Sequence, residues 1–500
     1  MIPITVALLC VSLLASSSLR RPIASPEVVP LPADDSWMNC YAIVAGKDCT
    51  VDGSVIFAHN EDSGSGNPVH FWKVPAQEHQ DIETQRLVNG GSEPFAAKTL
   101  SYIWCQMPGL RYSDTYFNEH GVAVASNGCH SRENKPELTD GGITYMLRRI
   151  VAARATSARH GVKIAASLVL TYGYADTGRT MTIADGKEAW IMNLVRGKHW
   201  AAARVPDDKF AAVANHYTIH RVDPGDKKNF NLSPGLIEYA KKRGWYEPKR
   251  DGEFDFATVY GSNGARLHGS NIRRVWRGYS LLGKGEFEES WRLPTFVEPA
   301  KKLKVSDLMG VLRDHYEGTK YDTSESYSKC SPNSMGPTIC AGGTSFSTVF
   351  QLRGDMPPSI GAVMWISMCR PDASIYVPWY AGIQKIPLGL SEGRAGDALR
   401  DHFDPAYKKL GQPTRFATVC DFGKRLGKVY GKFFPRLDKA RDALEAELLR
   451  KQPEVDATAR RLHKKAPQAA LDYLTSYTLA QQSRAYRMIR KWSEELHHGR

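Results

Sequence analysis

The chain has 500 residues, 42% hydrophobic and 24% charged, which is the composition of an ordinary globular protein with a large core. A net charge of +13 raises the question of a nucleic-acid partner, but the basic pairs at 148–149, 301–302, 460–461 and 464–465 lie near apolar residues at helical spacing. We therefore predict solvated helix faces and no nucleic-acid partner. The charge favours attraction to anionic surfaces such as a cell envelope.

The first residues have the pattern of an export signal. Residues 4–15 are apolar, too short a run to span a bilayer comfortably, and Ala15, Ser16 and Ser17 offer small residues for a signal peptidase. We predict a signal peptide at 1–17, a proline-containing propeptide or spacer at 18–39, an exported protein and no membrane insertion.

Strand and helix patterns follow from residue 40 onward. Residues 40–44 and 54–59 form apolar runs around a turn, which predicts a β-hairpin, and 115–117 with 121–126 predict a second pair. Further strands are predicted at 180–193, 199–214, 344–352 and 360–367. Helical spacing marks residues 142–170, 233–282, 305–316 and the chain from 433, the last broken by Pro453 and Pro467. This predicts an α+β fold with a main domain at 40–430 and a C-terminal helical extension at 431–500.

Nine cysteines are scattered along the chain without a C-x-x-C pair, so we expect no metal and no cofactor. Export would permit disulfides. Cys330 and Cys340, which flank a loop with Ser, Pro and Gly, are the first pair to consider.

Cys40 has an unusual chemical opportunity, because it follows the processing-prone Asn39 and begins a strand. Cleavage between them would give Cys40 a thiol and a free α-amine. An α-amine titrates near about pH 8, so it can accept the thiol proton directly or through water. The alternative is a small buried strand residue.

The surrounding segments resemble the dipeptidase A and secernin family of cysteine N-terminal-nucleophile (Ntn) hydrolases. The resemblance begins with Asn39-Cys40-Tyr41-Ala42-Ile43-Val44 and continues with Phe57-Ala58-His59-Asn60-Glu61-Asp62. It extends in order through segments at 118–123, 126–129, 213–217, 273–276, 312–319 and 376–380.

This resemblance implies a four-layer αββα sandwich, with 40–430 as the catalytic domain and Cys40 as the nucleophile. It further implies that Asp62 holds the α-ammonium of Cys40, that Asn127 and Asn215 contact the substrate or donate to the oxyanion, and that Arg274 stabilises the thiolate or the tetrahedral intermediate. Taken without the resemblance, Asp62 could cap a turn, and Asn127 and Asn215 could be turn residues. Arg274 could belong to a basic helix face.

Two neighbouring residues are candidates for tuning the thiol or binding the substrate, His59 and Asn60. Many relatives carry an arginine at the position of His59. A neutral imidazole lowers the pKa of a thiol less than a fixed guanidinium does, so the role of His59 is open.

The resemblance predicts short peptides, and dipeptides first, as substrates. An acylase for non-peptide amides, such as acyl-homoserine lactones, bile salts or penicillins, and a catalytically silent envelope-binding relative are the alternatives. A homo-oligomer is possible. The chain has no H-E-x-x-H, P-loop, G-x-S-x-G or Rossmann motif. Nothing in the sequence requires an ordinary Cys–His pair from Cys105 or Cys129 with His120 or His130.

Overall fold

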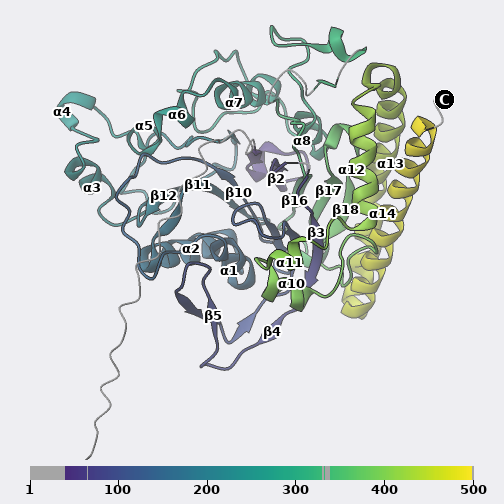
Figure 1. Ribbon diagram of the computed structural model, residues 1–500, viewed down its shortest axis with the longest axis horizontal. Coiled ribbons are helices and arrows are strands. Elements are labelled where there is room, and N and C mark those ends of the chain that lie inside the picture. The colour runs from purple at the N-terminus through teal and green to yellow at the C-terminus, as the bar shows by residue number, and fades with distance from the viewer. Residues whose placement is uncertain (1–39, 65, 329–330, 333–337, 498–500) are drawn as a thin grey trace, which may run out of the picture. The chain divides into compact units, whose positions relative to one another are not determined.

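The structure is a computed structural model that describes residues 40–64, 66–328, 331–332 and 338–497. These described residues belong to one compact unit (Figure 1). The expected signal peptide, the spacer, Asn39 and Cys330 lie outside the described residues.

Two antiparallel sheets form the centre of the described unit. The first has the strand order β14 (Phe210–Val213), β1 (Tyr41–Ala45), β2 (Val55–Glu61), β16 (Phe346–Leu352), β17 (Ala362–Met368) and β18 (Val377–Tyr380). The second has the order β15 (Phe230–Leu232), β13 (Trp200–Arg204), β12 (Ala189–Gly197), β11 (Tyr174–Ala184), β10 (Ala123–Gly128), β9 (Thr115–Asn118), β8 (Tyr102–Gln106) and β3 (His70–Val74). Both predicted strand pairs are therefore present, β1 with β2 and β9 with β10.

The two sheets pack face to face. Phe117 of the second sheet and Phe350 of the first have ring centroids 5.3 Å apart, and alanines from β10 join Phe57 of β2 in the same buried cluster. The strand β2 is buried along its whole length. Such a strand must be covered on both faces, which places it between this inner core and an outer helical layer.

One helical layer covers the second sheet. It consists of α1 (Met146–Arg154) and α2 (Ala158–Tyr172). Leu147 and Ile150 of α1 pack with Val124 and Ile183 of the sheet in a hydrophobic cluster separate from the one between the sheets. The sequence predicted continuous helical spacing over 142–170. The chain instead starts a new helix at Ser157, whose side chain accepts a hydrogen bond from the backbone N–H of His160 as an N-cap.

The opposite helical layer covers the first sheet. It includes α7 (Gly269–Leu282), α8 (Val305–Leu312), α12 (Thr414–Leu426), α13 (Tyr430–Lys465) and α14 (Pro467–His497). The order of layers is helix, sheet, sheet, helix, as the resemblance implies. In Figure 1 the long α13 and α14 run side by side next to β17 and β18. Among the described helices, none is both long and apolar enough to cross a membrane.

Short elements connect these layers. The region 233–282, expected to be helical, forms α7 together with α3 (Leu236–Lys242), α4 (Pro248–Asp251), α5 (Phe256–Tyr260) and α6 (Asn263–Arg266). The others are β4 (Gln77–Glu78), β5 (Thr84–Arg86), β6 (Ser92–Pro94), β7 (Lys98–Thr99), α9 (Pro358–Gly361), α10 (Ala395–Asp401) and α11 (Pro405–Lys408).

The expected break at Pro453 is wrong, because this proline lies inside α13. A proline within a helix removes one hydrogen bond and costs about 3 kcal/mol. Leu448 and Val455 on either side of it are buried in the main core, so tertiary packing offsets that cost. Pro467 does begin a new helix, α14. At the first position of a helix the backbone N–H has no acceptor within the helix, so a proline there removes no hydrogen bond.

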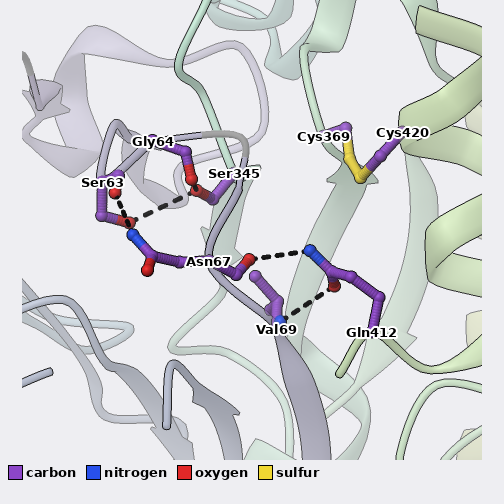
Figure 2. The surroundings of a disulfide bond; sticks show 8 residues. All are labelled: Ser63, Gly64, Asn67, Val69, Ser345, Cys369, Gln412 and Cys420. Atoms are coloured by element: carbon purple, nitrogen blue, oxygen red, sulfur yellow. Dashed lines mark hydrogen bonds between the residues drawn. A yellow bond between two sulfur atoms is a disulfide. The ribbon is translucent and has the colours of Figure 1, made fainter. Parts of the chain in front are cut away.

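Within the described residues a disulfide joins Cys369 to Cys420, and Cys340 keeps a free thiol, whereas Cys330, its expected partner, lies outside the described part of the chain. Cys369 directly follows β17 and Cys420 lies in α12, with the two Cα atoms 5.5 Å apart (Figure 2). The spacing of cysteines along the chain does not predict that Cys369 and Cys420 lie close together, because a disulfide depends on the distance between the two Cα atoms in space. Figure 2 also shows Gln412, ahead of α12, bound through its side chain to the backbone of Asn67 and Val69.

Candidate active site

Cys40 lies directly before β1, and its side chain faces the space between the two sheets. In the register of β1 with β2, Ala42 is opposite His59 and Tyr41 is opposite Asn60. Directly opposite residues share a face and the face alternates with each residue, so Cys40 belongs to the face of His59 and Glu61. The Cys40 thiol donates to Oε1 of Glu61 at 3.4 Å.

Asn60 lies on the other face of β2 and does not join this site. Its amide donates to the carbonyls of Leu312 and Ile339, at 2.9 Å each, and its Oδ1 accepts from the Ser347 hydroxyl. These bonds attach the C-terminal end of α8 and the segment before β16 to the sheet. The structure therefore does not bring Asn60 to the thiol, because strand alternation turns its side chain away from Cys40.

Arg274 connects α7 to the backbone of the cysteine. It is fully buried, and its Nη1 donates to the carbonyl oxygen of Cys40 at 3.2 Å. Its Nη2 donates to Oδ1 of Asn215 at 3.0 Å and to Oδ1 of Asn271 at 2.8 Å. The solvated helix face considered for this arginine is excluded by its burial.

Asn127 and Asn215 bridge the two sheets on either side of the site. The Asn127 amide on β10 donates to the Val213 carbonyl at 3.3 Å, and the Asn215 amide donates to the Gly128 carbonyl at 2.9 Å. Each amide group has two N–H donors, so one of these bonds leaves a second N–H for another acceptor. Both residues are therefore held near the start of β1.

Asp62 is buried beyond the end of β2. The Thr344 hydroxyl donates to its Oδ1, while within the described part of the chain Oδ2 has no hydrogen-bond partner. Burial raises the pKa of Asp62 to about 7, and the Thr344 hydrogen bond and the Arg274 charge oppose that rise. A cationic partner at Oδ2 would offset the cost of burying this charge.

Glu61 is a residue of the candidate site that the sequence reasoning did not single out. It is buried, and burial, more than any neighbouring charge, raises its pKa. Burial also raises the pKa of the Cys40 thiol, and the Glu61 charge adds to this. Two acidic groups this close in a dry site do not both ionise readily. Strand alternation from Cys40 across the hairpin could have found Glu61, because residues 59 and 61 share the face of the nucleophile.

His59 lies beside the thiol, at the position where many relatives are expected to carry an arginine. One nitrogen of His59, Sγ of Cys40 and a carboxylate oxygen of Glu61 all lie within 4.8 Å of one another. Burial lowers the pKa of His59 to about 3, so the ring is neutral at physiological pH. Among the described residues neither ring nitrogen has a hydrogen-bond partner.

Two buried arginines supply the positive charge that His59 lacks. Arg148 of α1 and Arg179 of β11 donate to the Ser126 hydroxyl at 2.8 and 3.4 Å, and both charges lower the pKa of Glu61. The expectation that Arg148 lies on a solvated helix face is therefore wrong. The α1 helix turns this arginine toward the sheet, where it donates to the Ser126 hydroxyl and its charge opposes the rise in the pKa of Glu61.

The other cysteines considered as nucleophiles have different surroundings. Cys129 is buried, accepts a hydrogen bond from the Thr180 hydroxyl at 3.1 Å and has its pKa raised to about 11 by burial. Cys105 is buried on β8 with its pKa also raised by burial. Burial raises the pKa of the Cys40 thiol in the same way, so what distinguishes Cys40 is its position directly before β1 and after Asn39.

The helix, sheet, sheet, helix layers, with Cys40 at the start of an inner strand beside buried acid, amide and guanidinium groups, have the arrangement of an Ntn-hydrolase fold. The profile of Peptidase family C69 matches residues 39–403, and the chain belongs to that family.

Known relatives agree with this assignment. A "probable dipeptidase" from Salmonella dublin is 30% identical over 376 residues, covering 72% of this chain and 84% of the relative. One from Latilactobacillus sakei is 27% identical over 354 residues, covering 68% of this chain and 74% of the relative.

Among solved structures, penicillin V acylase from Agrobacterium tumefaciens is 11% identical, with a TM-score of 0.33 over 71% of this chain and 88% of that chain. A mutant of conjugated bile acid hydrolase from Clostridium perfringens has a TM-score of 0.30 at 11% identity, over 66% and 89%.

Proposed function

We propose that this protein is an exported cysteine dipeptidase whose nucleophile, Cys40, becomes the first residue of the mature chain by cleavage after Asn39. Its free α-amine then accepts the thiol proton, and the thiolate attacks the amide carbonyl. The α-ammonium returns this proton to the amide nitrogen as the C–N bond breaks, so the second residue leaves as an amine and an acyl-enzyme remains. Water, deprotonated by the α-amine, then hydrolyses the thioester. The apolar run at 4–15 and the Cys369–Cys420 disulfide support export.

The residues around Cys40 suit the steps of this reaction. The free Oδ2 of Asp62 would hold the new α-ammonium in its charged state. The remaining N–H groups of Asn127 and Asn215 would donate to the oxyanion, a contribution of about 3 to 4 kcal/mol to the barrier for one such donor. Arg274 orients the Cys40 backbone and Asn215 together, because one guanidinium donates to both.

The observation that carries the choice of substrate is the contact between Cys40 and Glu61. In a dipeptide the α-nitrogen is two bonds from the carbonyl carbon that the thiolate attacks, about 2.5 Å away. A carboxylate 3.4 Å from the sulfur therefore lies within reach of the α-ammonium of a bound dipeptide. Glu61 supplies an acidic group for a free amino terminus, and an acylase substrate has no such charge to pair with it.

Two measurements test the proposal. Intact mass and N-terminal sequencing of the exported protein should give a mature chain that begins at Cys40, and Cys40→Ala should abolish hydrolysis while Cys105→Ser retains it. A stable mature chain that begins upstream of Asn39 and still hydrolyses dipeptides would contradict this mechanism.

The substrate is tested with free dipeptides against their N-acetylated forms. Wild type should prefer the free amines, and Glu61→Gln should lower kcat/KM for free dipeptides more than for N-acetyl dipeptides. Equal loss on both would show that Glu61 does not recognise the amino terminus. Activity on N-acyl substrates alone would favour the acylase alternative.

A further inference from the structure

A second cluster of buried ligand-type side chains lies outside the proposed catalytic machinery. His315 follows α8, Cys340 precedes β16, and Asp372 lies in the short turn Pro371–Ala373 after β17. One ligand atom from each lies within 4.8 Å of the other two, and all three residues are buried. We propose that His315, Cys340 and Asp372 bind a zinc ion that fixes these three segments together.

The histidine is oriented as a metal ligand. Its Nδ1 lies 3.0 Å from Oε1 of Glu317, a pairing that places the proton on Nδ1 and leaves the Nε2 lone pair pointing into the cluster. Among the described residues Nε2 has no hydrogen-bond partner. A carboxylate on the far nitrogen is the usual outer partner of a zinc-bound histidine, because it sets the tautomer and strengthens the ligand.

The aspartate is arranged to complete the set. Its Oδ2 lies 3.6 Å from Nε2 of His315 and its Oδ1 forms an ion pair with Nε of Arg370 at 3.3 Å, while within the described ranges neither carboxylate oxygen accepts a well-directed hydrogen bond. Two ligand atoms about 2.0 to 2.2 Å from a tetrahedral zinc ion are about 3.4 Å apart, so this separation is close to that of a bound pair. A thiolate, an imidazole and a carboxylate together favour zinc over magnesium or calcium.

The charges around the cluster are compatible with a divalent cation. Arg370 places Nε 3.3 Å from Oδ1 of Asp372, on the oxygen away from His315, and Arg441 donates to the Asp372 carbonyl at 2.9 Å. A zinc ion with one thiolate and one carboxylate is neutral as an assembly, so these arginines face no net positive charge.

An entry path and a consequence follow from the position of the cluster. His315 and Asp372 line a cavity of about 820 Å³ between α8 and α13, through which an ion and a fourth, water ligand can arrive. Cys340 lies four residues before Thr344, whose hydroxyl donates to Asp62. The metal would therefore hold in place the segment that positions Asp62.

The test is metal binding itself, independent of peptidase activity. Chelator-treated protein is titrated with Co²⁺ as a visible probe for zinc, and metal content after growth with zinc is measured by mass spectrometry. We expect a thiolate-to-cobalt charge-transfer band that saturates at about one ion per chain. It should be lost in Cys340→Ser and kept in Cys105→Ser. Glu317→Gln should weaken binding about 10- to 100-fold.

Two controls keep the result interpretable. Cys40, His59 and Glu61 also lie within 4.8 Å of one another, so the titration is repeated in Cys40→Ala, where the band must persist. If Cys340→Ser does not fold, His315→Gln must lose the band, since glutamine can still pair with Glu317. A wild-type protein without bound zinc or a cobalt band, or a band that disappears with Cys40 and not with Cys340, overturns the proposal.

Discussion

Sγ of Cys40 lies 3.4 Å from Oε1 of Glu61, and both side chains are buried between the two sheets. The charge of Glu61 raises the pKa of the thiol, after the larger effect of burial. The candidate nucleophile is therefore least reactive when its acidic neighbour is ionised and unpaired. A substrate α-ammonium would remove that inhibition as it binds.

Removing the charge of Glu61 should make the free thiol more acidic. We expect Glu61→Gln to lower the pKa of Cys40 in the mature protein, and a fall of one unit gives about tenfold more thiolate below the pKa. The rate of alkylation by iodoacetamide against pH measures this, with the exposed Glu494→Gln as control. An unchanged profile would show that Glu61 does not act on the thiol.

The raised pKa of Asp62 predicts a pH-dependent stability of the uncleaved chain. The folded state holds this proton more tightly than the unfolded state, so the free energy of unfolding should fall as pH rises from about 4 to about 7. Urea unfolding of Cys40→Ala, compared with the same protein carrying Asp62→Asn, measures the difference, which should vanish below about pH 4. Parallel profiles across this range would contradict the assignment.

Asn215 and Asn271 both accept a hydrogen bond from Arg274, but their substitution should affect catalysis to different extents. Asn215→Ala removes an amide donor near Cys40 and should lower kcat about 100- to 1000-fold. Asn271→Ala removes a similar contact of Arg274 without a proposed role at the oxyanion. We expect it to lower thermal stability with a much smaller loss of kcat. Equal losses of kcat would mean that both residues act only by holding Arg274.

The disulfide should stabilise the attachment of α12 to the first sheet. Cys369 and Cys420 are separated by 51 residues, and closing a loop of that size stabilises a fold by about 4 kcal/mol in the chain-entropy description. Cys369→Ser should lower the denaturant midpoint, and a reductant should lower the wild-type midpoint similarly without affecting the variant. If the reductant leaves the denaturant midpoint of the wild type unchanged, the disulfide does not contribute to its stability.

The alternation and spacing of apolar residues were enough to predict the first hairpin and the β9–β10 pair, because these are local patterns with short connections. The family resemblance supplied the layered fold, and the structure brings Cys40, Asp62, Asn127, Asn215 and Arg274 to one place. His59 is there too, as a neutral ring.

The tertiary structure decided what depends on contacts between distant segments. Sequence spacing could not place Arg148 inside the molecule, pair Cys369 with Cys420, or bring His315, Cys340 and Asp372 together, because each depends on how two layers meet. Pro453 lies inside α13 because the packing of buried residues on both sides of it outweighs the unfavourable effect of proline in a helix interior. The sequence by itself determined the start of β1 and the candidate nucleophile there. Only the packing of β1 against β2 placed the acid of Glu61 beside its sulfur.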